Sequence, residues 1–152
     1  MITINLICVG NLKEKFWQDA AGEYAKRLSK FCKLNIIEVA EQNKYENIEK
    51  IKEVEGQDII NHLSGKCFLL EIGGKQYSSE EFASVLDKSA LQASSLSFVI
   101  GGSYGTSEAV KNKIKDKLSF GKATYPHNLA RIILLEQIYR AFMINGGGKY
   151  HK

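Results

Sequence analysis

The stretch Phe98–His127, FVIGGSYGTSEAVKNKIKDKLSFGKATYPH, determines how this 152-residue chain is interpreted. Its first three residues are apolar, and they end at Gly101-Gly102, after which a helix-like segment begins. A second, shorter apolar piece leads to Tyr125-Pro126, and a long apolar helix follows. Ligands of parallel sheets bind beyond the carboxyl ends of the strands, so two permissive loops after two buried strands predict a ligand site.

The first loop, Gly101-Gly102-Ser103-Tyr104-Gly105, has the spacing GGxxG. Glycine adopts positive φ and lets the backbone approach a ligand closely. The spacing is not GxGxxG, and Lys111 lies too far along to be a Walker lysine, so a phosphate loop is not indicated. From the residues alone, a tight strand-to-helix turn and a ligand loop are equally good interpretations.

The second loop, Phe120–Tyr125, mixes small and apolar residues and contains no acidic side chain. That composition suits a neutral, flat ligand held by main-chain groups, such as an adenine ring. A plain connector between a strand and a helix is the alternative interpretation.

Strands and helices are expected to alternate along the whole chain, which predicts an α/β fold with a mainly parallel sheet. The fourth strand is apolar without alternation, so helices should cover both faces of the sheet. Because knots are rare, the pattern alone favours a flavodoxin-like or Rossmann-like strand order. The expected strands are Ile2–Val9, Leu34–Ala40, Cys67–Ile72, Leu96–Ile100 and Leu118–Phe120. The expected helices are Glu14–Ser29, Asn47–His62, Ser78–Leu91, Glu108–Lys117 and His127–Asn145.

The length and composition predict one domain covering residues 1–152. Hydrophobic residues are 44% and charged residues 25%, as in ordinary globular proteins rather than disordered chains. No apolar run is long enough to cross a bilayer, and Met1–Asn5 lacks the basic region of a signal peptide. The net charge of +4 permits binding to a polyanion without requiring it.

The cysteines Cys8, Cys32 and Cys67 are odd in number and widely spaced, with no adjacent histidine. This arrangement predicts neither a metal site nor a disulfide framework. Cys8 and Cys67 lie in apolar runs, so buried, reduced thiols are the favoured interpretation. Together with the absent signal peptide, they predict a cytoplasmic protein.

The last helix carries more apolar surface than a one-sided surface helix needs. Either it is buried in the core, or a second subunit covers part of it. Glu136 and Arg140 lie four residues apart in the favourable order and predict a helix-surface ion pair. Arg131 and His127 lie near the start of this helix. Arg131 could meet a phosphate or simply be solvated, and His127 is expected to have a supporting role.

The last three residues, Tyr150-His151-Lys152, form a polar cluster after a flexible triple glycine. An aromatic ring can stack on a base, an imidazole can handle a proton, and a lysine can meet a phosphate. In an arbitrary protein such a tail is usually frayed and idle.

The segments FVIGGSYG, LSFGKATYPH, EQIYRAF and KYHK resemble the ribosomal RNA large subunit methyltransferase H family. These enzymes are 23S rRNA pseudouridine-1915 N3-methyltransferases of the SPOUT superfamily. The resemblance covers essentially the whole chain and is most specific from Phe98 onward. It implies an α/β domain with a C-terminal trefoil knot, a homodimer with sites completed across the interface, and S-adenosyl-L-methionine as methyl donor.

The same resemblance implies a role for particular residues. The substrate would be 23S rRNA in the assembled 70S ribosome, with His151 as a candidate base and Tyr150 orienting the base ring. Arg131 and Lys152 would contact RNA, and neither a metal nor a membrane is involved. The residues that match the cofactor-binding positions are Leu70, Gly102, Phe120, Gly121, Lys122, Ala123, Thr124 and Tyr125.

Two other functions stay open from the sequence. One is a small dimeric module that binds a nucleotide or RNA without chemistry. The other is a flavodoxin-like protein, which would be yellow and unknotted.

Overall fold

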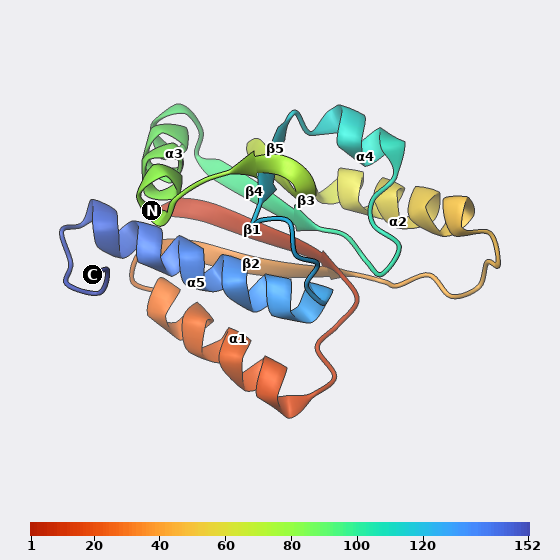
Figure 1. Cartoon of the computed structure of the whole chain (residues 1–152), viewed down its shortest axis with the longest axis horizontal. Coiled ribbons are helices and arrows are strands. Elements are labelled where there is room, and N and C mark those ends of the chain that lie inside the picture. Colours follow the sequence, from red (N-terminus) through yellow and green to blue (C-terminus); the bar gives the residue numbers. More distant parts are fainter.

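Parallel pairing of five strands organises the chain, and the computed structural model describes all residues 1–152 (Figure 1). The sheet order is β2-β1-β4-β3-β5, and helices cover both faces, so the predicted α/β class is confirmed. The strands are β1 (Ile2–Val9), β2 (Cys32–Val39), β3 (Lys66–Gln76), β4 (Ser95–Ile100) and β5 (Asp116–Ser119). The helices are α1 (Lys15–Leu28), α2 (Ile48–His62), α3 (Ser79–Gln92), α4 (Glu108–Lys113) and α5 (His127–Asn145).

The central strands are apolar on both sides because each side faces a helical layer. In β1, Ile4 and Leu6 point into the larger core, and Ile7 and Val9 point into the smaller core on the opposite face. Successive side chains of a strand alternate between faces, so an unbroken apolar run supplies both cores. Each fully buried side chain of this size contributes about 1.5–3 kcal/mol by the hydrophobic effect.

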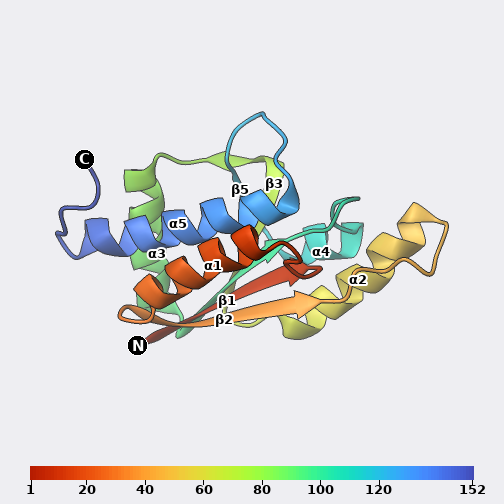
Figure 2. The same ribbon diagram turned by 90° about the horizontal axis from the view of Figure 1, so that it is seen from below.

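Helix α5 lies between α1 and α3 on one face of the sheet, while α2 and α4 pack together on the other (Figure 2). Leu134, Leu135 and Ile138 are completely or almost completely buried in this layer. The wide apolar surface of α5 is therefore explained in large part by neighbours on both sides and by the sheet beneath. Of the two explanations for this apolar surface, burial in the core of a single chain is therefore confirmed for these three residues.

The strand order differs from the one that pattern alone favoured. A flavodoxin-like sheet would place β3 beside β1, whereas here β4 lies between β1 and β3. A Rossmann-like sheet would place β2 between β1 and β3, whereas here β2 is an edge strand. Both orders that the pattern favoured were therefore wrong. The observed order is consistent with the knotted fold that the family resemblance implies.

Strand β3 runs past the glycines that were expected to end it and continues to Gln76. It pairs with β5 on both sides of an irregularity between Leu70 and Lys75. A Cβ on Gly74 would lie 2.7 Å from the backbone nitrogen of Leu118, so only glycine permits this approach. Gly73-Gly74 therefore does not end the strand, because β3 uses this segment to pair closely with β5.

Helix α4 is shorter than expected and ends at Lys113, because β5 begins at Asp116. Ile114 and Leu118, on either side of that start, are buried in opposite cores. Helix α3 begins as predicted: Ser78 Oγ accepts from the amide of Glu81, and Glu81 Oε1 accepts from the amide of Ser78.

Cys8 is buried, as expected, and Cys32 is buried as well. The expected burial of Cys67 was wrong, because this residue is partly exposed. Burial raises the pKa of the Cys8 thiol to about 12 and that of Cys32 to about 11. All three thiols are free.

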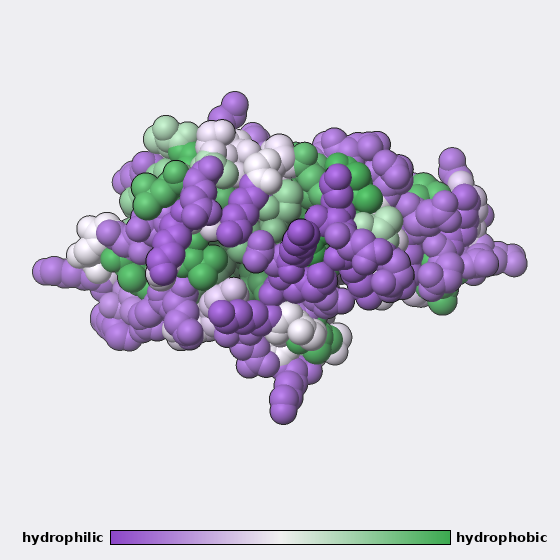
Figure 3. All heavy atoms as spheres, turned by 90° about the horizontal axis from the view of Figure 1, so that it is seen from above, coloured by the Kyte–Doolittle hydropathy of each residue, from purple (hydrophilic) through white to green (hydrophobic).

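The surface seen from above is mostly polar, with apolar surface in separate patches (Figure 3). Large exposed apolar side chains such as Phe16, Ile72 and Leu91 belong to different elements. None of the helices combines the length and the apolar character that a membrane crossing requires.

The position of the Arg131 side chain differs from both expectations that the sequence offered for it. Its side chain is neither solvated nor open to a phosphate, because the residue is only 2% exposed. Its NH1 donates to Glu38 Oε2 at 2.8 Å, and its NH2 donates to the carbonyl of Gly10 at 3.1 Å. The guanidinium thus joins α5 to the carboxyl ends of β1 and β2, and an RNA contact through this group does not fit its burial.

We expect Arg131→Ala to lower the free energy of unfolding by about 1–3 kcal/mol, because it breaks the bond of the buried Arg131 to the partly exposed Glu38 and leaves the Gly10 carbonyl without its donor. Urea denaturation followed by circular dichroism measures this loss. Lys15→Ala, which breaks an exposed pair with Asp19, is the control and should change stability by less than about 0.5 kcal/mol. Equal stability of wild type and Arg131→Ala would contradict the structural role.

Candidate functional site

A cavity of about 640 Å³ opens beyond the carboxyl ends of β4 and β5 and beside the irregular middle part of β3. Three segments line it: the stretch around Leu70–Ile72, the loop Ile100–Thr106, and the loop Ser119–His127. Its volume lies in the range of small-molecule sites, and its place follows the crevice rule for parallel sheets. The two loops that the sequence singled out therefore share one cavity.

Most residues that match cofactor-binding positions come together here. Lys122 is the exception, because its side chain does not line the cavity. His127 and Pro126, at the start of α5, also contribute to the wall. The matching residues in the lining are Leu70, Gly102, Phe120, Gly121, Ala123, Thr124 and Tyr125.

The first loop is both a tight turn and part of the cavity wall, so its two interpretations do not exclude each other. The amide of Gly105 donates to the carbonyl of Gly102 at 3.0 Å and closes the turn. A Cβ on Gly102 would lie 2.9 Å from Val9 Cγ1 and 3.3 Å from Glu55 Oε1. The backbone at Gly102 is thus pressed against the protein interior, which keeps the cavity open on its other side.

The sequence reasoning did not single out Glu55, which supports this loop from α2. The residue is 4% exposed, and its Oε2 accepts a hydrogen bond from the amide of Gln42 at 2.9 Å. Burial raises the pKa of its carboxyl group, against the opposing effect of that hydrogen bond. An acid at a helix position that the apolar period assigns to the interior is the signal that could have identified it.

The second loop is held at its start by the side chain of Ser119. The Ser119 hydroxyl accepts from the amide of Gly121 at 3.0 Å and donates to the Gly121 carbonyl at 3.1 Å. The cavity wall here combines these main-chain groups with the apolar side chains of Phe120 and Tyr125.

One pair of opposite charges lies in the cavity wall. Lys111 Nζ is 3.5 Å from Glu71 Oε1, and both side chains are about one-third exposed. Neither residue was singled out from the sequence, because Glu71 lies on β3 and Lys111 on α4, forty positions apart. The cavity can therefore meet a ligand that carries both a positive and a negative group.

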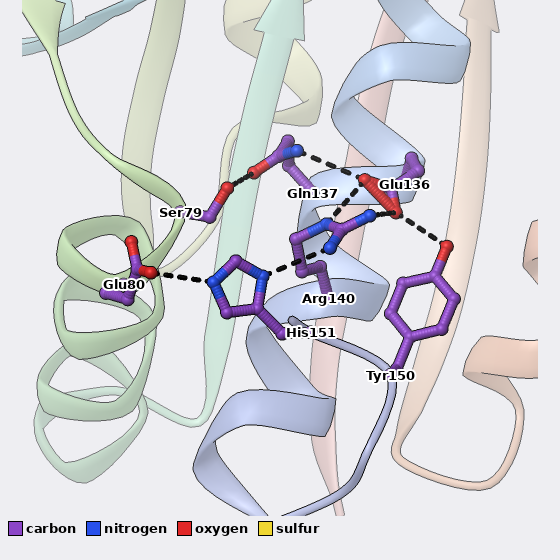
Figure 4. A network of polar contacts seen from close by, with 7 residues as sticks. All are labelled: Ser79, Glu80, Glu136, Gln137, Arg140, Tyr150 and His151. Atoms are coloured by element: carbon purple, nitrogen blue, oxygen red, sulfur yellow. Dashed lines mark hydrogen bonds and ion pairs between the residues drawn. The ribbon is translucent and has the colours of Figure 1, made fainter.

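The C-terminal tail is docked rather than frayed, and it folds back against Glu136 and Arg140 of α5 (Figure 4). The Tyr150 hydroxyl donates to Glu136 Oε2 at 3.0 Å, and His151 contacts Arg140 and Glu80. Arg140, which contacts His151, lies about 20 Å of helical rise beyond His127, and neither Tyr150 nor His151 is among the residues that line the cavity. The structure of one chain therefore does not bring Tyr150 and His151 to its own cavity.

Glu136 and Arg140 form the predicted pair, but both side chains are three-quarters or more buried and carry the tail. Arg140 lies 4.7 Å from the centre of the Tyr150 ring, and Tyr139 packs edge-on against the same ring. Partial burial and the bond to Glu136 raise the pKa of Tyr150. Lys152, the last residue, is exposed.

Within the structure, no group of three or more His, Cys, Asp or Glu side chains is arranged to hold a metal ion.

Comparison with known proteins identifies the family. The model described as "Predicted SPOUT methyltransferase" matches residues 2–151. Proteins named ribosomal RNA large subunit methyltransferase H from Lactobacillus acidophilus and Clostridium botulinum are each 49% identical to this chain. One from Lactobacillus helveticus is 47% identical. In all three cases 99% of this chain aligns with the whole of the relative. The chain therefore belongs to the ribosomal RNA large subunit methyltransferase H family of the SPOUT methyltransferases.

Proposed function

We propose that this protein transfers a methyl group from S-adenosyl-L-methionine to N3 of pseudouridine 1915 in 23S rRNA, within the assembled 70S ribosome. The observation that carries the proposal is the shared cavity. Three segments that match the cofactor positions of the family converge on it, although two of them are separated by an entire helix and strand.

The lining fits the proposed cofactor in two respects. The segment Phe120–Tyr125 offers main-chain groups and apolar surface, which suit an adenine ring. The Glu71–Lys111 pair offers opposite charges, which suit an amino group and a carboxylate. When bound, the cofactor supplies an activated methyl group, and the task of these residues is to orient it.

The chain has only a small excess of positive charge with which to bind the phosphates of RNA. Its net charge is only +4, Arg131 is buried, and the exposed cations at the end of the chain are Lys149 and Lys152. Non-specific affinity for RNA grows with the number of phosphates that cations neutralise. This is why we assign recognition to the shape of the assembled ribosome rather than to naked RNA.

The separation of tail and cavity supports a homodimer in this proposal. Neither Tyr150 nor His151 lines the cavity of its own chain, and Arg140, which contacts His151, lies about 20 Å of helical rise beyond His127 in the cavity wall. An antiparallel pair of subunits would place the tail of one chain beside the cavity of the other. The nucleobase would then enter between the Gly102 loop of one subunit and the His151 of its partner.

We expect the purified protein to transfer labelled methyl groups to 70S ribosomes that lack the modification. Naked 23S RNA should react slower by about tenfold or more, because few phosphate contacts are available to hold it. Scintillation counting of recovered rRNA measures both rates. Equal rates would refute recognition of the assembled particle, and RNA binding without any methyl transfer would favour a binding module.

Gly102→Ala should weaken cofactor binding by about tenfold or more, since the added methyl group collides with Val9 and displaces the loop. Isothermal titration with S-adenosyl-L-methionine measures the affinity. The control is Gly22→Ala in α1, where a Cβ meets nothing within 4 Å. That change should leave the affinity unchanged and stabilise the helix by about 0.5–1 kcal/mol. Unchanged binding by Gly102→Ala would remove this loop from the cofactor site.

Mixing two inactive variants tests whether the site is shared between subunits. Gly102→Ala impairs cofactor binding in the cavity, and His151→Ala removes the imidazole of the tail. The homodimer of either variant should therefore methylate rRNA slowly. After subunit exchange, half of the dimers are mixed and each carries one intact site, so about a quarter of wild-type activity should return. No recovery, or a sedimentation mass of only 17.0 kDa at micromolar concentration, would contradict the shared site.

A further inference from the structure

The side chains that hold the tail form one continuous network (Figure 4). The Glu136 carboxylate accepts from Arg140 Nε at 3.0 Å, from Arg140 NH2 at 3.2 Å and from the Tyr150 hydroxyl at 3.0 Å. It also accepts from Gln137, which in turn accepts from Ser79 at the start of α3. Arg140 is therefore fixed by two parallel bonds to a well-held carboxylate, a geometry that a lysine cannot reproduce.

The NH1 group of Arg140 determines which nitrogen of the neutral His151 ring carries the hydrogen. Arg140 NH1 lies 3.1 Å from His151 Nδ1. A guanidinium has five N–H donors and no acceptor, so Nδ1 must accept and cannot carry a proton. The proton of the ring is then on Nε2, which donates to Glu80 Oε1 at 2.7 Å. This direction agrees with the lowered pKa of Glu80, whose largest cause is the hydrogen bond from His151.

Both nitrogens of the His151 ring therefore already have a hydrogen-bond partner. The only lone pair in the ring plane, on Nδ1, is held by Arg140, and Nε2 carries a hydrogen. A general base needs a free lone pair within reach of the proton it removes. The docked ring offers a hydrogen-bond donor instead.

We infer that Arg140 is a positioning residue that fixes the tautomer of His151, so that His151 donates a hydrogen bond to the nucleobase instead of removing its proton. This inference rests on the proposed function. The acceptor would be a carbonyl oxygen beside the N3 that is methylated. Glu80 Oε1 marks where that oxygen would lie, and the Glu80 side chain is 63% exposed and can yield its place.

This arrangement suits the chemistry of an imide. Negative charge that develops when N3 loses its proton spreads onto the adjacent carbonyl oxygens, and a fixed donor stabilises it there. The proton passes to water, N3 forms the bond to the methyl carbon, and the electrons of the broken carbon–sulfur bond remain on sulfur. One such donor contributes about 10²–10³ in rate in other enzymes.

Tyr150 has a different role from the one expected from the sequence. Its hydroxyl is used on Glu136, and its ring is covered by the edge of Tyr139 and by Arg140. The ring therefore anchors the tail and is not free to stack on a base.

The tautomer can be measured without any enzymatic assay. The protein has three histidines, so ¹⁵N-histidine labelling gives few signals, and His151→Ala assigns the one from the tail. Long-range ¹H–¹⁵N correlation spectra of the wild-type protein should show protonated Nε2 and unprotonated Nδ1. Arg140→Lys should replace this by averaged signals of both tautomers. A wild-type ring protonated on Nδ1 would overturn the inference and leave the proposed methyl transfer untouched.

Activity of tail variants separates a donor from a base. The amide nitrogen of a glutamine can take the place of Nε2–H, but it has no basic lone pair. Single-turnover methylation by His151→Gln should stay within about tenfold of wild type, whereas His151→Ala should lose about 10²–10³-fold. If His151 were the base, both variants would be equally slow, and that result would refute the donor role.

Arg140→Lys should lower the single-turnover rate by about tenfold or more at an unchanged affinity for S-adenosyl-L-methionine, because the ring loses its fixed tautomer. Glu53→Gln, which removes an exposed pair with Lys50 on α2, is the matched control and should behave as wild type. A wild-type rate for Arg140→Lys would show that this residue does not position the ring. Absence of methyl transfer by the wild-type protein itself would count against the proposed function instead.

Discussion

The rest of the structure depends on the pairing of β4 with β1 on one side and β3 on the other. Both neighbours run parallel to β4, so its residues are buried on both faces, and Leu96, Phe98 and Val99 are almost completely shielded from water. This pairing brings the carboxyl ends of β4 and β5 and the irregular part of β3 around Leu70–Ile72 to one edge of the sheet. Because backbone groups at that edge are no longer used in the sheet, the loops that leave it can line a cavity.

Helix α5 connects the two parts of the candidate site. Its first turn contributes His127 and Ala130 to the cavity wall, and Glu136 and Arg140, in its middle and second half, carry the network that holds the tail. Leu134 and Leu135, between these ends, are buried against the sheet and neighbouring helices. The apolar middle of the helix thus keeps the cavity and the tail at a fixed separation. This separation is the physical reason for our proposal that two subunits complete the site.

Charged side chains in this protein act mainly where burial has removed competing water. Arg131 and Glu38 join α5 to the edge of the sheet, and Glu55 supports the Gly102 loop from below. Arg140 and Glu136 hold the tail. An exposed ion pair contributes little because water screens it, whereas a partly buried, doubly bonded pair fixes geometry. These pairs therefore matter for where loops and rings are placed as well as for stability.

The sequence by itself determined the class of fold, nearly all helices and strands, and the two loops that form the cavity, because apolar periodicity and glycine placement are local properties. Through the family resemblance it also indicated Leu70, which lies far from those loops along the chain. Only the tertiary structure decided the position of β4, the burial of Arg131, the support from Glu55, and the docking of the tail. These depend on contacts between residues as far apart as Glu38 and Arg131 or Glu80 and His151, and such contacts leave no periodic mark in the chain. The hydrogen-bonding state of His151 belongs to the same group, since only the neighbouring guanidinium decides which ring nitrogen carries the proton.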